Sequence, residues 1–305
     1  MYSYRVFGLN LYSQLQLPEL SPACFAEPDV RIQLAEVPDT LPQPLKLRPR
    51  FDLSAKSLLL RIPGVGRFYV DSGRLIHVAP VPEANAKNLR RFLLGSCLGA
   101  VLQQRGLMPL HAGAIDTPTG AVLICGNSGA GKSTATALLA SRGFAILTDD
   151  VAALQVKRNH VVLEPGYPQL KLWKNSMSQL RLNPEAHDVV RPGREKYVVK
   201  ISRGFVLQPR PVAALVQLYP TDIDAPRLRL LSGGERIVAM KRNVYRKNYL
   251  APSQGPDYFR QYVQFAQSFP AYELQRPEHG NSMEEVADLI EQLSERLSST
   301  EHINS

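Results

Sequence analysis

The sequence predicts an α/β protein in two parts, a small β-rich domain over residues 1–84 and a larger mixed domain over residues 85–305. Three observations support this prediction. The first 80 residues alternate apolar and polar side chains in short segments divided by proline or glycine, which is typical of strands. Helical periodicity begins at residue 85. A glycine-rich loop then stands between an apolar strand and an alanine-rich helix, an arrangement found in phosphate-binding α/β domains.

The composition is that of a globular protein with a partner of opposite charge. The chain has 305 residues, 44% hydrophobic and 21% charged, with a net charge of +9, which favours an acidic partner such as a nucleotide or an acidic peptide. The basic residues form no run of five or six, so we expect no nucleic acid partner. The longest apolar stretch is too short for a bilayer, so we expect no membrane partner either. Three distant cysteines, Cys24, Cys97 and Cys125, indicate reduced thiols and a cytoplasmic location.

In the N-terminal part, the strand pattern repeats at short spacing. Seven prolines between positions 18 and 49 oppose any helix there. We therefore expect a small antiparallel β domain. Its predicted strands cover residues 4–11, 30–37, 57–62, 66–71 and 74–80.

The second part opens with a predicted helix over residues 85–105 that joins the two halves. Asn85 is a suitable N-cap and Gly106 a suitable stop. Its apolar face consists of Leu89, Phe92, Leu93, Leu98 and Leu102.

The remaining chain alternates strands and helices. Ser232 with Glu235, and Asn281 with Glu284, have capping-box spacing and mark two helix starts. The polar tail over residues 298–305 is predicted to be frayed. The predicted strands cover residues 108–116, 121–126, 144–150, 151–157, 161–166, 197–201 and 212–220, and the helices cover residues 132–143, 175–182, 232–243, 255–268 and 281–298.

The segment GNSGAGKS fits the pattern G-x-x-x-x-G-K-[ST] through Gly126, Gly131, Lys132 and Ser133. Its glycines let backbone N–H groups point at phosphate oxygens, and the helix that follows adds its positive end. The alternative is a structural strand–helix turn. The predicted nucleotide-binding residues are Gly126, Asn127, Ser128, Gly129, Ala130, Gly131, Lys132, Ser133 and Thr134.

Two carboxylates and a histidine flank this loop. Asp149 and Asp150 end a strand, and Asp149 lies 17 positions after Lys132, room for one helix and one strand. Carboxylates at this point suit a Mg²⁺ ligand or a general base. His111 lies on the preceding strand, where its imidazole can reach the same strand ends. The alternatives are an ordinary Asp-Asp turn and a structural histidine.

The motifs LHAGAID, GNSGAGKS and ILTDD, in this order and spacing, resemble the kinase domain of HPr kinase/phosphorylase. Residues 7–20 and 164–173 resemble HPr-kinase-like proteins of peptide-modification gene clusters, some of which phosphorylate a serine of a lasso-peptide precursor. The resemblance runs from the N-terminus to about residue 175. It implies a P-loop kinase core with a mixed sheet, like that of phosphoenolpyruvate carboxykinase, and a serine kinase that uses ATP and Mg²⁺.

The sequence departs from that family after the Asp pair. The family carries there a glycine-rich signature with an acidic residue and an arginine, and EPGYPQLKLWKN occupies the region here. Glu164 is a candidate for the missing acid. The departure bears on HPr as substrate, on reverse phosphorolysis and on hexamer formation.

The motifs give each residue an expected role in phosphoryl transfer. Lys132 and the loop amides hold the β- and γ-phosphates, and Ser133 binds Mg²⁺ with Asp150. Asp149 is the general base, assisted by His111, although the two Asp roles are exchangeable on sequence grounds. Three basic residues are candidates for holding the γ-phosphate or an acidic substrate: Lys171, Arg194 and Lys196.

The expected function is therefore phosphate transfer to a serine of a peptide or protein. Two alternatives stay open, a kinase of sugars or other metabolites and a non-catalytic nucleotide-binding regulator. A metabolite needs a closed pocket, whereas a peptide needs a long, partly basic groove. The sequence leaves open the choice between ATP and GTP and whether the protein forms a homo-oligomer.

Overall fold

The computed structural model describes residues 1–158, 160–191, 193–249 and 255–301. The chain forms two compact units, one of Met1–Pro109 with Tyr245–Gln261 and one of Leu110–Val244 with Tyr262–Ser305. The predicted division placed residues 85–105 in the second domain, whereas in the structure they group with the β-rich unit. The last four residues of the predicted frayed tail lie outside the described residues; its first four continue a helix.

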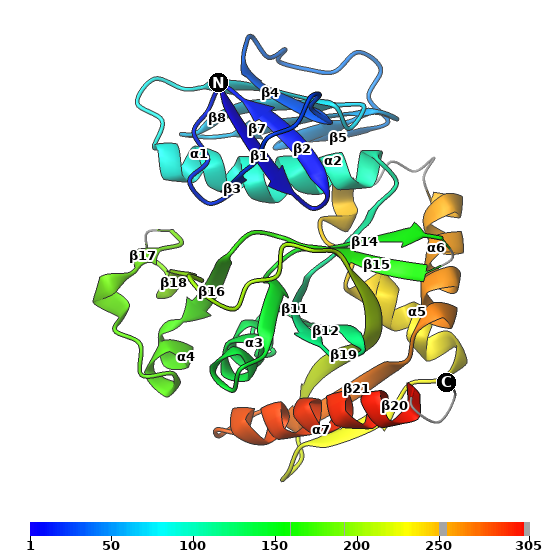
Figure 1. The fold of residues 1–305 in the computed structure, drawn as a ribbon. Helices are drawn as coiled ribbons and strands as arrows, with labels where there is room; N and C mark the ends of the chain where they lie inside the picture. The colour runs from blue at the N-terminus through cyan, green and yellow to red at the C-terminus, as the bar shows by residue number, and fades with distance from the viewer. Residues whose placement is uncertain (159, 192, 250–254, 302–305) are drawn as a thin grey trace. The chain divides into compact units, whose positions relative to one another are not determined.

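The first unit is built on one nine-stranded sheet, with the strand order β3-β1-β2-β4-β9-β8-β7-β6-β5 (Figure 1). Four of the five predicted strands are confirmed. The single strand predicted over residues 4–11 is wrong, because the chain turns at Phe7 and Gly8, which have φ angles of 54° and 73°, and forms a hairpin of two strands instead. The expected antiparallel arrangement is wrong at two pairings, because β4 runs parallel to both β2 and β9. The strands are β1 (Tyr2–Val6), β2 (Leu9–Ser13), β3 (Ser21–Pro22), β4 (Val30–Leu34), β5 (Lys46–Arg48), β6 (Phe51–Leu53), β7 (Ser57–Ile62), β8 (Gly66–Asp71) and β9 (Leu75–Pro80).

The predicted helix over residues 85–105 is present but contains a π-helical turn. It consists of α1 (Ala86–Phe92), η1 (Leu93–Cys97) and α2 (Leu98–Gln104). Asn85 is its N-cap, as predicted, and its side chain accepts hydrogen bonds from the backbone N–H groups of the second and third helical residues. The ring of Phe92 packs against that of Phe68 on β8, which explains why the helix belongs to the β-rich unit.

Two glycines of this helix make room for Tyr245, which follows much later in the chain. A Cβ atom on Gly95 would lie 3.2 Å from the Tyr245 hydroxyl, and one on Gly99 would lie 3.1 Å from its ring. Gln103 Nε2 also donates to the Tyr245 carbonyl at 2.8 Å. These contacts hold Tyr245 in the first unit.

The second unit contains a mixed sheet, which confirms the predicted α/β class. Its strand order is β10-β14-β15-β19-β12-β11-β13, with β21 beside β19 and β20 beside β21. β12 is parallel to β19 and β19 to β21, and the other registered pairs are antiparallel. The strands are β10 (Met108–Leu110), β11 (Ala112–Thr117), β12 (Gly120–Gly126), β13 (Ala145–Thr148), β14 (Ala152–Lys157), β15 (His160–Glu164), β19 (Arg210–Thr221), β20 (Arg227–Leu230) and β21 (Ala271–Pro277).

A separate three-stranded sheet accompanies this core. Its order is β16-β18-β17, with β16 (Gln169–Trp173), β17 (Asp188–Val189) and β18 (Lys196–Lys200). Leu170, Leu172 and Met177 pack it and the next helix against Ala137 and Ile146 of the core. The helical segments of the second unit are α3 (Lys132–Ser141), α4 (Lys174–Gln179), η2 (Pro184–Ala186), α5 (Gly233–Arg242) and α7 (Met283–Glu301). η3 (Lys247–Tyr249) belongs to the first unit, and α6 (Gly255–Ser268) has residues in both.

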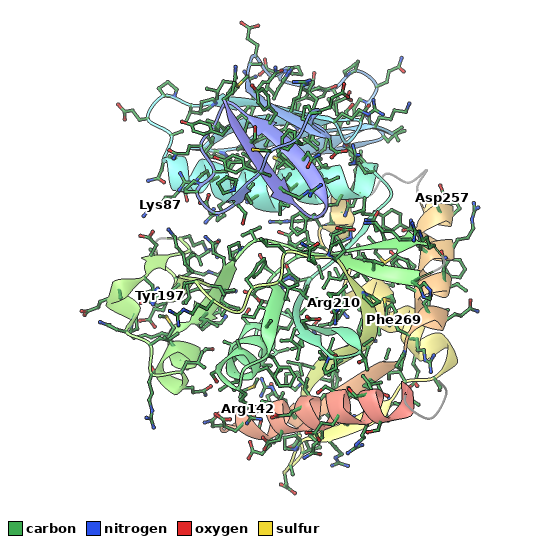
Figure 2. All side chains as sticks on the ribbon, in the orientation of Figure 1. Lys87, Arg142, Tyr197, Arg210, Asp257 and Phe269 are labelled. Carbon is green, nitrogen blue, oxygen red and sulfur yellow. The ribbon has the colours of Figure 1, made fainter. Side chains whose placement is uncertain are left out.

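α3 and α7 share one apolar layer with the mixed sheet. Buried Leu139 of α3, Ile290 of α7 and Ile124 of β12 belong to the same cluster. At the end of α3, Arg142 reaches α7, where it pairs with three carboxylates at 2.7–3.0 Å (Figure 2): Glu284, Asp288 and Glu291. None of the described helices combines the length and the hydropathy needed to cross a bilayer.

One predicted capping box is confirmed and the other is wrong. The Glu235 carboxylate accepts the Ser232 backbone N–H at 3.0 Å at the start of α5. At α7 the helix begins at Met283, two residues after Asn281. Glu284 turns instead to Arg142, and Asn281 accepts a hydrogen bond from Gln179. Longer-range partners therefore replace the local cap.

Candidate active site

The glycine loop connects β12 directly to α3, as the sequence predicts. Gly126, Gly129 and Gly131 have φ angles of 141°, 88° and 104°, a region that other residues rarely adopt. A Cβ atom on Gly126 would lie 2.7 Å from the Leu218 carbonyl oxygen of the neighbouring strand. The loop thus requires glycine at its first position for packing as well as for the turn.

Lys132 is folded back onto this loop. Its side chain is buried, and Nζ donates to the carbonyl oxygens of Gly126 at 2.7 Å and Asn127 at 3.0 Å. Burial lowers the pKa of the ammonium group. Since backbone carbonyls are weak partners for a buried cation, a bound polyanion would compete well for this ammonium group.

Asp149 lies beside Ser133, the residue that follows Lys132 in the chain. Ser133 Oγ donates to Asp149 Oδ1 at 2.9 Å, and the Lys171 backbone N–H donates to Oδ2 at 2.8 Å. Burial, with the charge of Asp150 adding to it, raises the pKa of the Asp149 carboxyl against these hydrogen bonds. Both carboxylate oxygens are thereby oriented, one of them toward the start of α3.

Asp150 faces a different set of partners. Its Oδ2 accepts from Lys171 Nζ at 2.6 Å, and its Oδ1 lies 3.2 Å from His111 Nδ1. Burial alone would raise the pKa of this carboxyl, but Lys171 and His111 outweigh it and hold the pKa well below its usual range. The φ of Asp150 is 80°, a strained value for a residue with a side chain, and such strain gathers at functional sites.

His111 is fixed by contacts at both its backbone and its ring. Its N–H donates to the Asn243 carbonyl at 2.7 Å, and its Nδ1 lies 2.9 Å from the Asp150 carbonyl. A carbonyl oxygen only accepts, so Nδ1 carries a proton in this contact.

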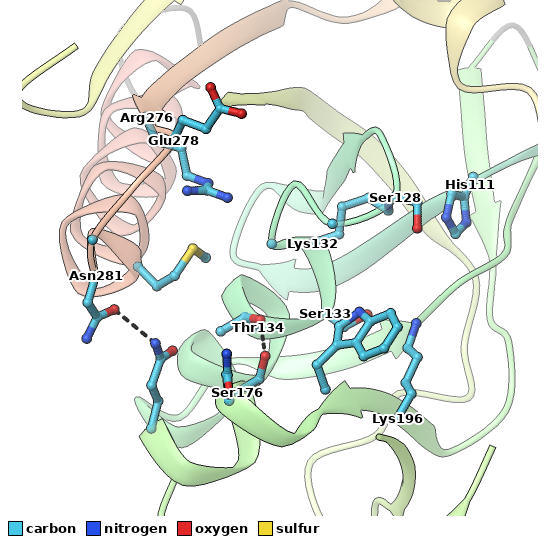
Figure 3. A pocket seen from close by; sticks show the side chains of 17 residues that line it. His111, Ser128, Lys132, Ser133, Thr134, Ser176, Lys196, Arg276, Glu278 and Asn281 are labelled. Carbon is cyan, nitrogen blue, oxygen red and sulfur yellow. Dashed lines mark hydrogen bonds between the residues drawn. The ribbon is translucent and has the colours of Figure 1, made fainter. Parts of the chain in front are cut away.

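A pocket of about 300 Å³ lies over the loop and the start of α3 (Figure 3). One wall is the loop itself, a second comes from β16, α4 and β18, and a third from the end of β21 and the start of α7. The lining residues are His111, Ser128, Gly129, Gly131, Lys132, Ser133, Thr134, Trp173, Asn175, Ser176, Gln179, Lys196, Arg276, Glu278, Gly280, Asn281 and Met283.

The three basic residues predicted for the acceptor side lie in different surroundings. Lys171 is paired with Asp150, as described. Lys196 lines the pocket, with its Nζ 5.6 Å from the centre of the Trp173 ring. Arg194 is exposed and is absent from the residues that line this pocket. Glu164, the candidate for the missing acid, is buried on β15, where it bonds Gln155 and Lys157 instead of lining the pocket.

Sequence reasoning missed several residues of the site. Asn243 Oδ1 accepts the Gly126 N–H at 3.1 Å, and its Nδ2 donates to Gln217 Oε1 and the Ala239 carbonyl. Arg276 Nε donates to the loop carbonyl of Ala130 at 3.0 Å. Both lie more than a hundred positions from the loop and in no motif. The one available signal was the helix end predicted at residue 243.

Comparison with known proteins gives a limited result. No family model and no curated protein matches the chain. Among solved structures, the Hpr(Ser) kinase/phosphatase from Coxiella burnetii is similar, with 12% sequence identity over 64% of this chain and 96% of that chain, and a TM-score of 0.36. At this level of likeness, function has to be inferred from the geometry of the site itself.

Proposed function

We propose that the protein is a kinase that uses ATP and Mg²⁺ and transfers the γ-phosphoryl group to a serine hydroxyl of a peptide or protein. The observation that carries the proposal is the pair of adjacent carboxylates with separate partners. Asp149 bonds Ser133 at the start of α3, and Asp150 lies between His111 and Lys171. Transfer to an acceptor needs two such functions, one beside the metal and one beside the incoming hydroxyl.

The residues present fit Mg²⁺ and a nucleoside triphosphate. Ser133 and Asp149 offer the oxygen atoms that Mg²⁺ prefers, and they are already hydrogen-bonded to each other at 2.9 Å. Over the described residues, no three His, Cys, Asp or Glu side chains gather as a metal site of their own. Ser133 and Asp149 would hold the ion, which would supply positive charge against the negative charge that develops on the phosphates. The loop amides and Lys132 would hold the same phosphates.

We assign the two carboxylates the reverse of the roles given first in the sequence analysis, an exchange that the sequence left open. Asp149 is the partner of Ser133 on the metal side, and Asp150 is the base on the acceptor side. In the transfer, the serine oxygen forms a bond to the γ-phosphorus while the bond to the β,γ-bridging oxygen breaks. The serine proton passes to the Asp150 carboxylate, and the electron pair of the broken bond leaves with ADP. His111 and Lys171 position Asp150 for this step.

The charge distribution supports a peptide acceptor. Residues 171–205, here called the basic arm, carry eight Lys or Arg against three Asp or Glu, an excess of five within a net charge of +9. The arm contains α4, β17 and β18 and contributes Trp173 and Lys196 to the pocket wall. A basic segment that contributes to the pocket wall suits an acidic peptide better than a small metabolite.

The proposal is tested by incubating the protein with γ-labelled ATP and Mg²⁺, in one series with serine peptides, first those encoded by neighbouring genes, and in a parallel series with small hydroxyl compounds. We expect label on a peptide serine. Label only on a small hydroxyl compound would support the metabolite kinase instead, and bound ATP that is never turned over would support a regulator.

The two carboxylate roles are separated by titrating Mg²⁺ in two matched variants. Asp149→Asn is expected to raise the Mg²⁺ concentration needed for half-maximal rate. Asp150→Asn is expected to lower kcat by about 10²–10⁴-fold, the usual contribution of a general base, with the Mg²⁺ requirement unchanged. The reverse pattern would restore the assignment of Asp149 as base and Asp150 as metal partner.

A further inference from the structure

Resting on the proposed function, we propose that the end of the pocket between α4 and the start of α7 binds the nucleoside of ATP. Its polar contacts are Gln179 and Asn281, and its apolar wall is Met283. Neither amide belongs to the phosphate-loop motif, and the two lie 102 positions apart in the chain.

The position of the glycine loop indicates which end of the pocket would hold the phosphates and which the nucleoside. Lys132 and the Ser133–Asp149 pair mark the place of the β- and γ-phosphates, because the lysine and the metal act there. His111, beside Asp150, marks the γ end. The nucleoside must therefore lie toward the opposite end, past Thr134. Figure 3 shows His111 and Lys196 on one side of the loop and Asn281 on the other, with Thr134 between them.

The residues at that opposite end suit a nucleoside. Gln179 Nε2 donates to Asn281 Oδ1 at 3.1 Å, and both side chains are exposed at the pocket wall. Amide groups are the side chains that recognise the N6 and N7 edge of adenine. A Cβ atom on Gly131 would lie 2.9 Å from the Met283 sulfur, so this apolar side chain adjoins the loop. A purine offers the matching flat apolar face and polar edge.

The charges at this end favour a nucleoside over further phosphate groups. Arg276 donates to the Ala130 carbonyl and lines the pocket, and burial lowers the pKa of its guanidinium. It suits the α-phosphate, next to the loop. Glu278 lines the pocket just beyond it, and a carboxylate there would repel additional phosphate while accepting hydrogen bonds from ribose hydroxyls.

A comparison of two ligands isolates the nucleoside contacts. Calorimetry would give the Kd of the full chain for ATP and for inorganic tripolyphosphate, both with Mg²⁺. The double variant Gln179→Ala/Asn281→Ala is expected to bind ATP about tenfold more weakly, since two hydrogen bonds are lost, and tripolyphosphate with unchanged affinity. The matched control is Gln264→Ala/Gln267→Ala on exposed positions of α6, which should change neither affinity.

Other outcomes overturn the inference in distinguishable ways. Equal weakening of both ligands would mean that the amides act through the loop, and no weakening would place the nucleoside elsewhere. If the wild-type protein binds tripolyphosphate as tightly as ATP, no nucleoside subsite exists, although the phosphate site does. An unchanged protein that binds neither ligand would refute the proposed function and this inference with it. Thermal melting of each variant checks that the fold is retained.

Discussion

Replacing Asn243 with alanine is expected to destabilise the protein and to weaken ATP binding together. The Asn243 side chain is buried and makes three hydrogen bonds, from the Gly126 N–H at 3.1 Å, to Gln217 at 3.2 Å and to the Ala239 carbonyl at 2.8 Å. Each buried partner left unsatisfied costs about 1–3 kcal/mol, but Gln217 can relax toward another partner. We therefore expect a loss of about 2–4 kcal/mol in the free energy of unfolding.

Urea denaturation and thermal unfolding measure this effect. For a domain of this size, about 2–4 kcal/mol corresponds to a Tm lower by about 4–16 °C. ATP affinity should fall as well, since Gly126 begins the phosphate loop. The control is Asn248→Ala, at an exposed position. A loss below about 1 kcal/mol, or weaker ATP binding with unchanged stability, would refute the view that Asn243 braces the loop through buried hydrogen bonds.

Three further predictions address the pocket. Trp173, the single tryptophan of the chain, lines the pocket beside Lys196, so its fluorescence should change when ATP and Mg²⁺ bind, and a constant signal at saturation would contradict the site. Because the pKa of Asp149 is raised, kcat/KM should fall as the pH drops through that pKa. This acid limb should move to lower pH as Mg²⁺ is increased, and a limb indifferent to Mg²⁺ would separate Asp149 from the metal. Gly131→Ala should weaken ATP binding at least tenfold and cost about 1–3 kcal/mol of stability in urea, because its φ is 104°. Adding Met283→Ala relieves the 2.9 Å contact with the new Cβ atom but not the strain, so full recovery would contradict the strain argument.

The sequence predicted those parts of the site that depend on neighbouring residues. The glycine loop needs a strand, a turn and a helix in succession, and local periodicity and glycine spacing encode all three. The adjacency of Ser133 and Asp149 could be anticipated because one helix and one strand separate them. The separate partners of Asp149 and Asp150 could not, since they depend on how Lys171 of another sheet approaches the strand end.

The missed features depend on distant pairing. Arg276 reaches the loop only because β21 pairs with β19, which in turn pairs with β12. β20 escaped prediction because its RLRL pattern reads as a basic surface stretch. The parallel pairing of β4 with β9 leaves no local signal either. The acceptor, the oligomeric state and the cytoplasmic location stay predictions from the sequence.

The return of the chain to its first unit has a consequence for the order of events on the ribosome. Tyr245, which occupies the space left by Gly95 and Gly99, is made 142 positions after Gln103, its hydrogen-bonding partner. At about 5–20 residues per second, the helix of the first unit waits roughly 7–28 s for this side chain. During that interval the groove over its two glycines lies open, so a nascent chain stalled before residue 245 should expose it to chaperones or to protease.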